Sequence, residues 1–145
     1  MRPRRTTVRH PRTKGPVVWI IDSEQWPRAC LRAELIERGY DAYGFITIQD
    51  ALEWFTQPAS PAADSIILEL RGQKLTKQLL EAIQNLNVPI IVLGGSTELN
   101  ESLIEERKWD EVLKRPISLG KVADVVQKRL THKATIETER TSHGI

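Results

Sequence analysis

Two acidic residues stand at the ends of apolar runs, where burial of a carboxylate is unfavourable unless it has a partner. Asp22 closes the run VVWIID, and Glu69 lies near the end of the run SIILEL. A basic residue, Arg115, follows a shorter run in the turn KRP. Carboxylates bind metal ions or act as nucleophiles, and the planar guanidinium group of arginine pairs readily with a carboxylate. These residues define the chemistry to be explained, provided that the fold brings them together.

The chain alternates short apolar runs with longer amphipathic segments. The expected strands are residues 17–22, 40–45, 65–70, 88–93 and 110–113. The expected helices are residues 23–39, 47–55, a stretch within 74–86, about 98–107 and about 119–130. Three strands (17–22, 65–70 and 88–93) are apolar on both faces, which favours a parallel sheet covered by helices on both sides. The polar residues at the strand ends should then meet at the carboxyl edge, where open sheets of this type place their sites.

Polar residues at several expected helix starts have the spacing of N-terminal caps. Thr47 is followed three residues later by Asp50, and Ser118 precedes the last expected helix. Ser96 and Thr97 stand just before ELNESLIEER, where a capping role is expected. The surrounding GGST lacks the length and the lysine of a phosphate-binding loop, so a nucleoside triphosphate site is not expected.

Charge is distributed unevenly along the 145 residues. Residues 1–16 carry six basic side chains and no acid, which indicates a flexible basic arm. Residues 131–145 are polar and lack apolar periodicity, which indicates a polar C-terminal tail. Residues 17–130 have the size of one ordinary domain. No apolar run approaches the roughly 18 to 20 residues of a membrane span, and no signal-peptide pattern is present, so a cytoplasmic protein is the expectation.

Over about residues 17–130 the sequence resembles the receiver domain of two-component response regulators. The segment WIIDSE resembles the family's first strand with its acidic pair, and SIILELR resembles its third strand. VPIIVL resembles the fourth strand, and VLKRP resembles the Lys-Pro turn after the fifth. The resemblance implies a doubly wound α/β fold of five strand-helix units, whose five-stranded parallel sheet has the order 2-1-3-4-5 and helices on both faces.

The resemblance also implies a phosphoacceptor pocket, which this sequence fills with unusual residue types. The family's Asp nucleophile falls on Glu69, its acidic pair on Asp22 and Ser23, its Ser or Thr on Gly94, its Lys on Arg115 and its switch aromatic on Val112. Among these, Asp22 alone has the usual type. The pocket is therefore expected to be degenerate, with no catalytic residue.

The departures have physical consequences. The extra methylene of Glu69 moves an attacking oxygen by roughly 1 Å or more, which disrupts near-attack positioning for phosphoryl transfer. Mg²⁺ demands octahedral oxygen ligands, and Asp22 and Glu69 are the remaining candidates, so Mg²⁺ binding is expected to be weak or lost and no cofactor is expected. The sequence leaves open whether Glu69 pairs with Arg115, because it fixes neither side chain's direction.

The favoured hypothesis is an atypical, stand-alone receiver that is not an enzyme and acts through protein-protein interaction without Asp phosphorylation. Its expected partner is a histidine kinase or an effector, or a second copy bound through the fourth helix, fifth strand and fifth helix, within residues 100–130. One alternative is a receiver that is still phosphorylated, on Glu69 with Mg²⁺. Another is binding of nucleic acid or an acidic surface by the arm, but no recognition helix or stacking platform supports nucleic acid.

Overall fold

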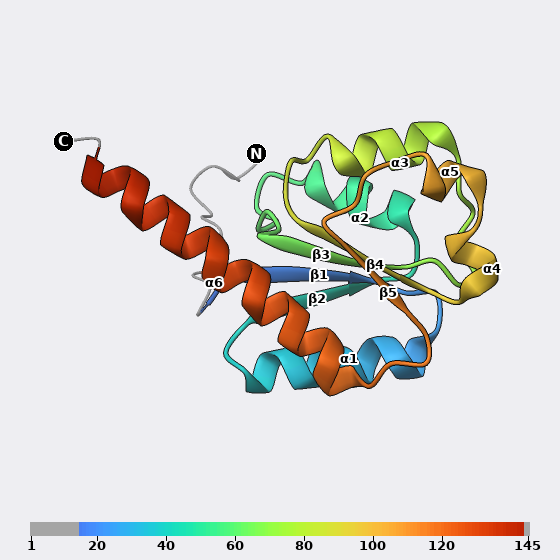
Figure 1. Ribbon diagram of the computed structural model, residues 1–145, viewed down its shortest axis with the longest axis horizontal. Helices are drawn as coiled ribbons and strands as arrows, with labels where there is room; N and C mark the ends of the chain where they lie inside the picture. The colour runs from blue at the N-terminus through green and yellow to red at the C-terminus, as the bar shows by residue number, and fades with distance from the viewer. Residues whose placement is uncertain (1–14, 144–145) are drawn as a thin grey trace, which may run out of the picture.

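The computed structural model describes residues 15–143, with side chains described from residue 15 to residue 131. Five short strands form one parallel sheet: β1 (Val17–Ile21), β2 (Asp41–Phe45), β3 (Ser65–Glu69), β4 (Ile90–Gly94) and β5 (Glu111–Lys114). The strand order is β2-β1-β3-β4-β5, and all neighbours run parallel (Figure 1). The predicted fold class and strand order are confirmed.

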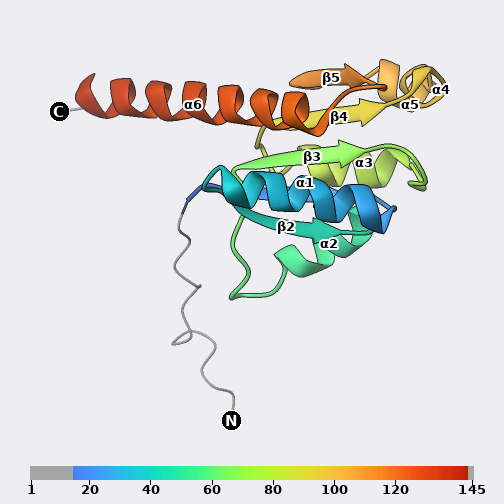
Figure 2. The same cartoon turned by 90° about the horizontal axis from the view of Figure 1, so that it is seen from below.

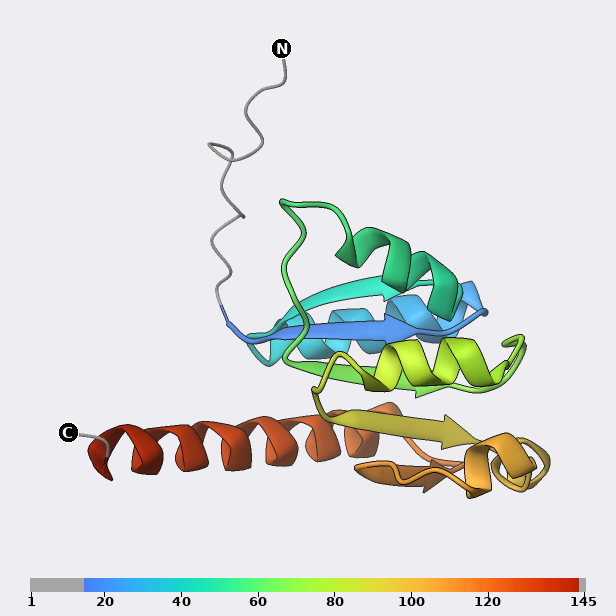
Figure 3. The same cartoon turned by 90° about the horizontal axis from the view of Figure 1, so that it is seen from above.

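The helices cover both faces of this sheet, as the doubly apolar strands required. They are α1 (Gln25–Glu37), α2 (Ile48–Phe55), α3 (Lys77–Gln84), α4 (Ser96–Leu99), α5 (Ser102–Glu105) and α6 (Leu119–His143). Helices α2 and α3 lie on one face, and Figure 3 views the sheet from their side. Helices α1 and α6 lie on the other face (Figure 2).

Alternate residues of the central strands feed two separate cores. On β1, Trp19 and Ile21 pack toward α2 and α3, whereas Val18 and Ile20 pack toward α1 and α6. Every residue of β1, β3 and β4 is buried. The only charged residues buried among those described are Asp22 and Glu69, so both acids lie at the end of a strand with little access to water.

The helix starts follow the predicted cap chemistry at two of three places. The Thr47 hydroxyl accepts the Asp50 N–H at 3.0 Å, and the Ser118 hydroxyl accepts the Lys121 N–H at 3.2 Å. The third prediction is wrong, because Gly95 is the residue before α4 and its N–H is bonded at 2.6 Å to the side chain of Glu98. The hydroxyls of Ser96 and Thr97 therefore do not cap this helix.

Two helix boundaries also differ from expectation. The helix predicted at about 98–107 is divided into α4 and α5, because Asn100 ends the first and Glu101 adopts an extended conformation. The last helix does not end near Leu130 but continues to His143 and projects beyond the amino edge of the sheet (Figure 2). No glycine or proline lies between Gly120 and Gly144, so nothing in that sequence stops the helix.

The predicted basic arm falls largely outside the described residues, which include only Gly15 and Pro16 of it. Within the part of the chain that the structure describes, no helix is long and apolar enough to cross a membrane.

Candidate functional site

The residues singled out in the sequence meet at the carboxyl edge of the sheet. Asp22 follows β1, Glu69 ends β3, Gly94 ends β4 and Arg115 follows β5. Because β1, β3, β4 and β5 are neighbours and parallel, their ends lie side by side at this edge, and the residues gathered there are called the pocket below.

Glu69 and Arg115 form a direct ion pair, which answers the question that the sequence left open. One Glu69 oxygen, Oε2, accepts a hydrogen bond from Arg115 Nη1 and another from the Arg71 backbone N–H at 2.9 Å. The hydrogen bond to Glu69 raises the pKa of the Arg115 guanidinium above its usual value. Glu69 is 2% exposed, so the pair holds a carboxylate that water hardly reaches.

Arg115 also connects the pocket to the start of α4. Its Nη2 donates a hydrogen bond to Oε1 of Glu98 at 3.2 Å, and the same oxygen accepts the Gly95 N–H. A methyl group at Gly94 would lie 3.3 Å from the Glu98 side chain. Gly94, where the sequence resemblance places a hydroxyl, is thus crowded by Glu98, which is itself held by Arg115.

A second arginine, Arg71, enters the pocket from the loop after β3 and was not anticipated from the sequence. Its Nη2 lies 3.4 Å from Asp22 Oδ1 and 3.9 Å from Glu69 Oε1. Its Nε lies 3.1 Å from an oxygen of Glu24. The guanidinium group therefore bridges the two buried acids and also pairs with the exposed side chain of Glu24.

The two residues after β1 hold the neighbouring loop in place. Asp22 Oδ1 accepts the Glu24 N–H at 2.9 Å, and the Ser23 hydroxyl donates to the Arg71 carbonyl at 3.0 Å. Gly72 has a positive φ of 75°, and a methyl group there would come within 2.3 Å of Ser23 Oγ. Close contact between Ser23 and the turn at Gly72 is what directs Arg71 back over the acids.

Val112, at the position of the switch aromatic, lies on edge strand β5 and is half exposed. In the sheet, Val112 pairs with Val92 of β4, which is not a pocket residue. Its aliphatic side chain has no polar group that could form a hydrogen bond with a pocket residue. Trp109, by contrast, packs against the α2–α3 core and donates its indole N–H to the Ile104 carbonyl at 3.0 Å.

Comparison with solved structures supports the fold. The receiver domain of a Francisella response regulator superposes with a TM-score of 0.68 at 20% identity, covering 82% of this chain and 99% of that domain. A response regulator receiver domain from Clostridium thermocellum gives 0.68 at 19% identity, covering 83% and 98%. A streptococcal protein, described as one of a family of redox sensors evolved from two-component response regulators, gives 0.72 at 18% identity. That alignment covers 86% of this chain and 55% of the streptococcal protein.

These similarities establish that the chain has the fold of response regulator receiver domains. No protein-family profile matches the sequence, and no curated protein matches it. The identities of 18–20% define the fold alone. The function must be argued from the pocket itself.

The pocket residues do not fit the Mg²⁺ ion that the fold family implies. Asp22 and Glu69 supply two negative charges, and Arg71 and Arg115 supply two positive charges within hydrogen-bonding or ion-pair distance of them. A divalent cation would have to displace both guanidinium groups to reach the carboxylates. Among residues 15–131, no cluster of three or more His, Cys, Asp or Glu side chains is arranged to hold a metal.

Proposed function

We propose that this protein is a receiver-like signalling domain that works without phosphorylation and without Mg²⁺, and that its output is binding to another protein. The observation that carries the proposal is the filling of the acidic pocket by Arg71 and Arg115. The protein keeps the fold of a receiver, but its own arginine side chains pair with the carboxylates that phosphoryl transfer would use.

Each step of phosphoryl transfer meets an obstacle in this pocket. Nucleophilic attack needs an oxygen aligned with the phosphorus, but Glu69 Oε2 already accepts two hydrogen bonds and Oε1 faces the Arg71 guanidinium at 3.9 Å. Charge on the transferring group needs a metal ion or mobile donors, but both arginines are engaged by carboxylates. Gly94 has no hydroxyl to contact the product. Glu69 is therefore proposed as a structural residue of the pocket rather than a nucleophile.

The proposed partner is a protein such as a histidine kinase or an effector. A second copy bound through α4, α5, β5 and α6 belongs to the same proposal, because half-exposed Val112 lies on that surface. The alternative of phosphorylation on Glu69 is an outcome of the test below. Binding through the basic arm concerns residues outside the described part of the chain.

Intact-mass measurement after incubation with acetyl phosphate and Mg²⁺ tests the proposal. We expect no phosphoryl adduct, and no change in tryptophan fluorescence on adding beryllofluoride and Mg²⁺. A typical receiver with an aspartate nucleophile, treated in parallel, is the positive control. The chain itself offers a matched variant, Glu69→Asp with Arg71→Ala and Arg115→Lys, in which the pocket is reopened and Mg²⁺ binding should increase.

An adduct that peptide mapping places on Glu69 would refute the proposal and support the alternative receiver. Mg²⁺ binding by the unmodified protein that equals binding by the reopened variant would refute it as well, because the arginines would then not exclude the ion.

A further inference from the structure

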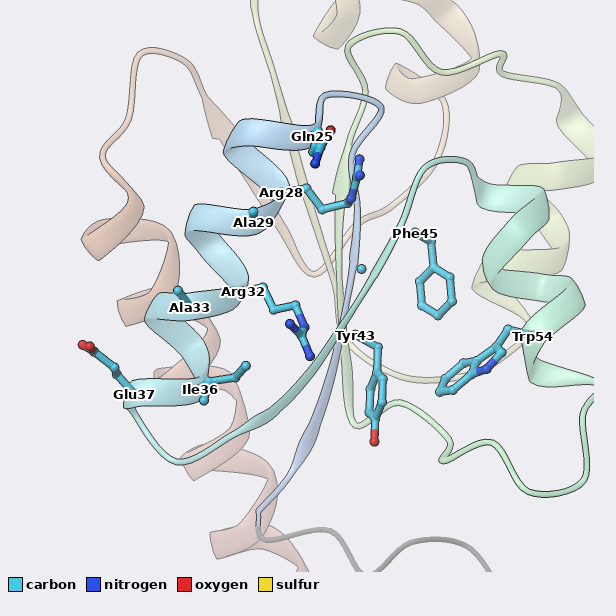
Figure 4. Close-up of a pocket in the computed structure, with 11 residues that line it drawn as sticks. Gln25, Arg28, Ala29, Arg32, Ala33, Ile36, Glu37, Tyr43, Phe45 and Trp54 are labelled. Atoms are coloured by element: carbon cyan, nitrogen blue, oxygen red, sulfur yellow. The ribbon is translucent and has the colours of Figure 1, made fainter.

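An open groove lies on the opposite side of α1 from the α6 contact, at the edge of the sheet formed by β2. It has a volume of about 770 Å³ and is bounded by α1, β2 and the end of α2. Figure 4 shows Arg28 and Arg32 reaching from α1 toward β2, with Tyr43, Phe45 and Trp54 on the far side of the strand. The groove is lined by none of the pocket residues Asp22, Glu69, Arg71 and Arg115, and it adjoins the pocket where Arg28 contacts the backbone of Asp22.

The floor of the groove is the unpaired edge of β2. Strand β2 is the first strand in the sheet order and pairs only with β1. The Asp41 N–H bonds to the Pro16 carbonyl, and the Phe45 carbonyl accepts the Asp22 N–H, so these residues direct their backbone groups inward. By the alternation of parallel strands, Ala42 and Gly44 direct theirs outward into the groove.

Two arginines of α1 lie against the outward-facing residues Ala42 and Gly44 of this edge. Arg32 Nε donates to the Ala42 carbonyl at 2.8 Å. The aliphatic stem of Arg28 lies over Gly44, where a methyl group would come within 3.1 Å of it, and Arg28 Nη1 donates to the Asp22 carbonyl at 2.7 Å. Neither guanidinium group forms a salt bridge with a carboxylate among residues 15–131, unlike Arg38, Arg71, Arg107, Arg115 and Arg129.

The spacing of the arginines matches that of an extended chain. Residues four apart on a helix are separated by about 6 Å along its axis, and side chains two apart on a strand by about 6.6 Å. Arg28, Arg32 and half-exposed Ile36 stand at successive four-residue steps on α1 and all line the groove. They would therefore face positions i, i+2 and i+4 of a strand lying beside β2.

We propose that this groove binds an extended acidic segment of a partner protein, with two carboxylates two residues apart and an apolar side chain two residues further on. The segment adds to the edge of β2 at Gly44, its carboxylates take the free N–H donors of Arg28 and Arg32, and its apolar side chain packs on Ile36. Edge addition supplies the backbone hydrogen bonds, and the two arginines supply the specificity. The groove would be a partner surface of this domain. This assignment rests on the proposed function, because it assumes that the domain acts by binding a protein.

Other occupants fit the groove less well. Two copies related by a two-fold axis would bring Arg28 and Arg32 against the same arginines, which is repulsive. Single-stranded nucleic acid needs open aromatic faces, but Trp54 packs its ring against Tyr43 and Phe45 at centroid distances of 4.9 and 5.2 Å. The bond from Arg32 to Ala42 also shields part of the edge, as charged residues on edge strands commonly do, and leaves Gly44 as the site of pairing.

The test is a titration followed by NMR, with the Gly44 amide as reporter. The probe is the peptide Gly-Glu-Thr-Glu-Thr-Leu-Gly with blocked ends, together with its reversed sequence. Saturable shifts of Gly44 with at least one of the two are expected at millimolar concentration. A peptide with lysine in place of both glutamates should not bind.

Charge reversal distinguishes specific binding from general attraction. Arg28→Glu with Arg32→Glu should weaken binding of the glutamate peptide about tenfold or more and create binding of the lysine peptide. Lys121→Glu with Lys128→Glu, two exposed lysines on α6, changes the net charge equally and should leave binding unchanged. The milder Arg32→Gln replaces the double variant if thermal unfolding shows that the latter is not folded, and it should weaken binding measurably.

The proposal is overturned if neither peptide shifts Gly44, or if charge reversal on α6 weakens binding as much as reversal on α1. Tighter binding of an oligothymidine that depends on Arg28 and Arg32 would also overturn it and assign the groove to nucleic acid. These results are independent of the phosphate-adduct experiment, so either proposal can fail while the other stands.

Discussion

Removing Arg115 should destabilise the protein far more than neutralising Glu69, although both changes break the same ion pair. The side chain of Glu69 is 3% exposed, whereas that of Arg115 is 27% exposed. In Arg115→Met the buried carboxylate stays behind with little water. In Glu69→Gln the arginine stays behind, and it still has solvent and Glu98 at 3.2 Å.

The magnitudes follow from what each partner retains. Removing one member of a buried pair typically costs about 3–5 kcal/mol. After loss of Arg115, Glu69 keeps the Arg71 N–H at 2.9 Å and the Arg71 guanidinium at 3.9 Å, so we expect about 3 kcal/mol. For Glu69→Gln we expect about 1 kcal/mol, because the amide oxygen still accepts a hydrogen bond. Replacing both residues by Met should cost less than Arg115→Met alone, because no charge is stranded.

Urea unfolding followed by tryptophan fluorescence measures these differences, since Trp19 is fully buried. The transition midpoint should fall in the order parent, Glu69→Gln, Arg115→Met, with the slope unchanged. Repeating the series at high salt is the control, because screening weakens exposed pairs more than buried ones. Equal losses for the two single variants, or losses that disappear in salt, would show that the carboxylate is not held in a buried pair.

Three further predictions concern other parts of the structure. Gly72→Ala should cost about 2–3 kcal/mol because of the positive φ and the contact with Ser23, and Ser23→Ala in that background should restore part of the loss in urea unfolding. Trp19→Phe should change stability by no more than about 1 kcal/mol, because it removes an indole N–H that has no partner among the described residues while leaving a small cavity; a loss of several kcal/mol would contradict this. Burial raises the pKa of Tyr40 and Tyr43, so their contribution to stability is complete below about pH 10 and is lost as pH rises through the native pKa. Between about pH 9 and pH 11, the midpoint temperature of thermal unfolding should therefore fall less steeply with pH for the variant Tyr40→Phe with Tyr43→Phe than for the parent. Identical slopes of midpoint temperature against pH would contradict this assignment.

The fold could be read from the sequence because its signals are local and strong. Strands β1, β3 and β4 are continuous apolar runs whose burial on both faces requires two helical layers. Thr47 and Ser118 mark helix starts by side-chain chemistry that depends only on neighbouring residues. The division into α4 and α5, and the continuation of α6, depend on marginal preferences at single positions, which a pattern of apolar residues does not resolve.

The pocket was only partly predictable, for a different reason. The strand ends placed Asp22, Glu69 and Arg115 at one edge, but the sequence could not fix the direction of a long side chain such as that of Arg115. Arg71 was missed because its place depends on the turn at Gly72 and on the contact of that turn with Ser23. The available signal was an arginine two residues after Glu69 and next to a glycine. This signal indicates a pocket residue only if the loop after β3 folds back over the acids, and the sequence does not show that.

Arg71 and Arg115 together add the same charge to the pocket that one Mg²⁺ ion would add, but they are attached to the chain. Their pairing with the buried carboxylates of Asp22 and Glu69 is therefore independent of metal concentration, and under the proposed function the pocket has one state rather than two. A domain with one pocket state transmits no signal by pocket occupancy. Its regulation must then lie in the presence of its partner or in the accessibility of the surface that the partner contacts. The groove beside β2, whose two arginines form no salt bridge among the described side chains and which neither Asp22 nor Glu69 lines, is one surface available for such a contact.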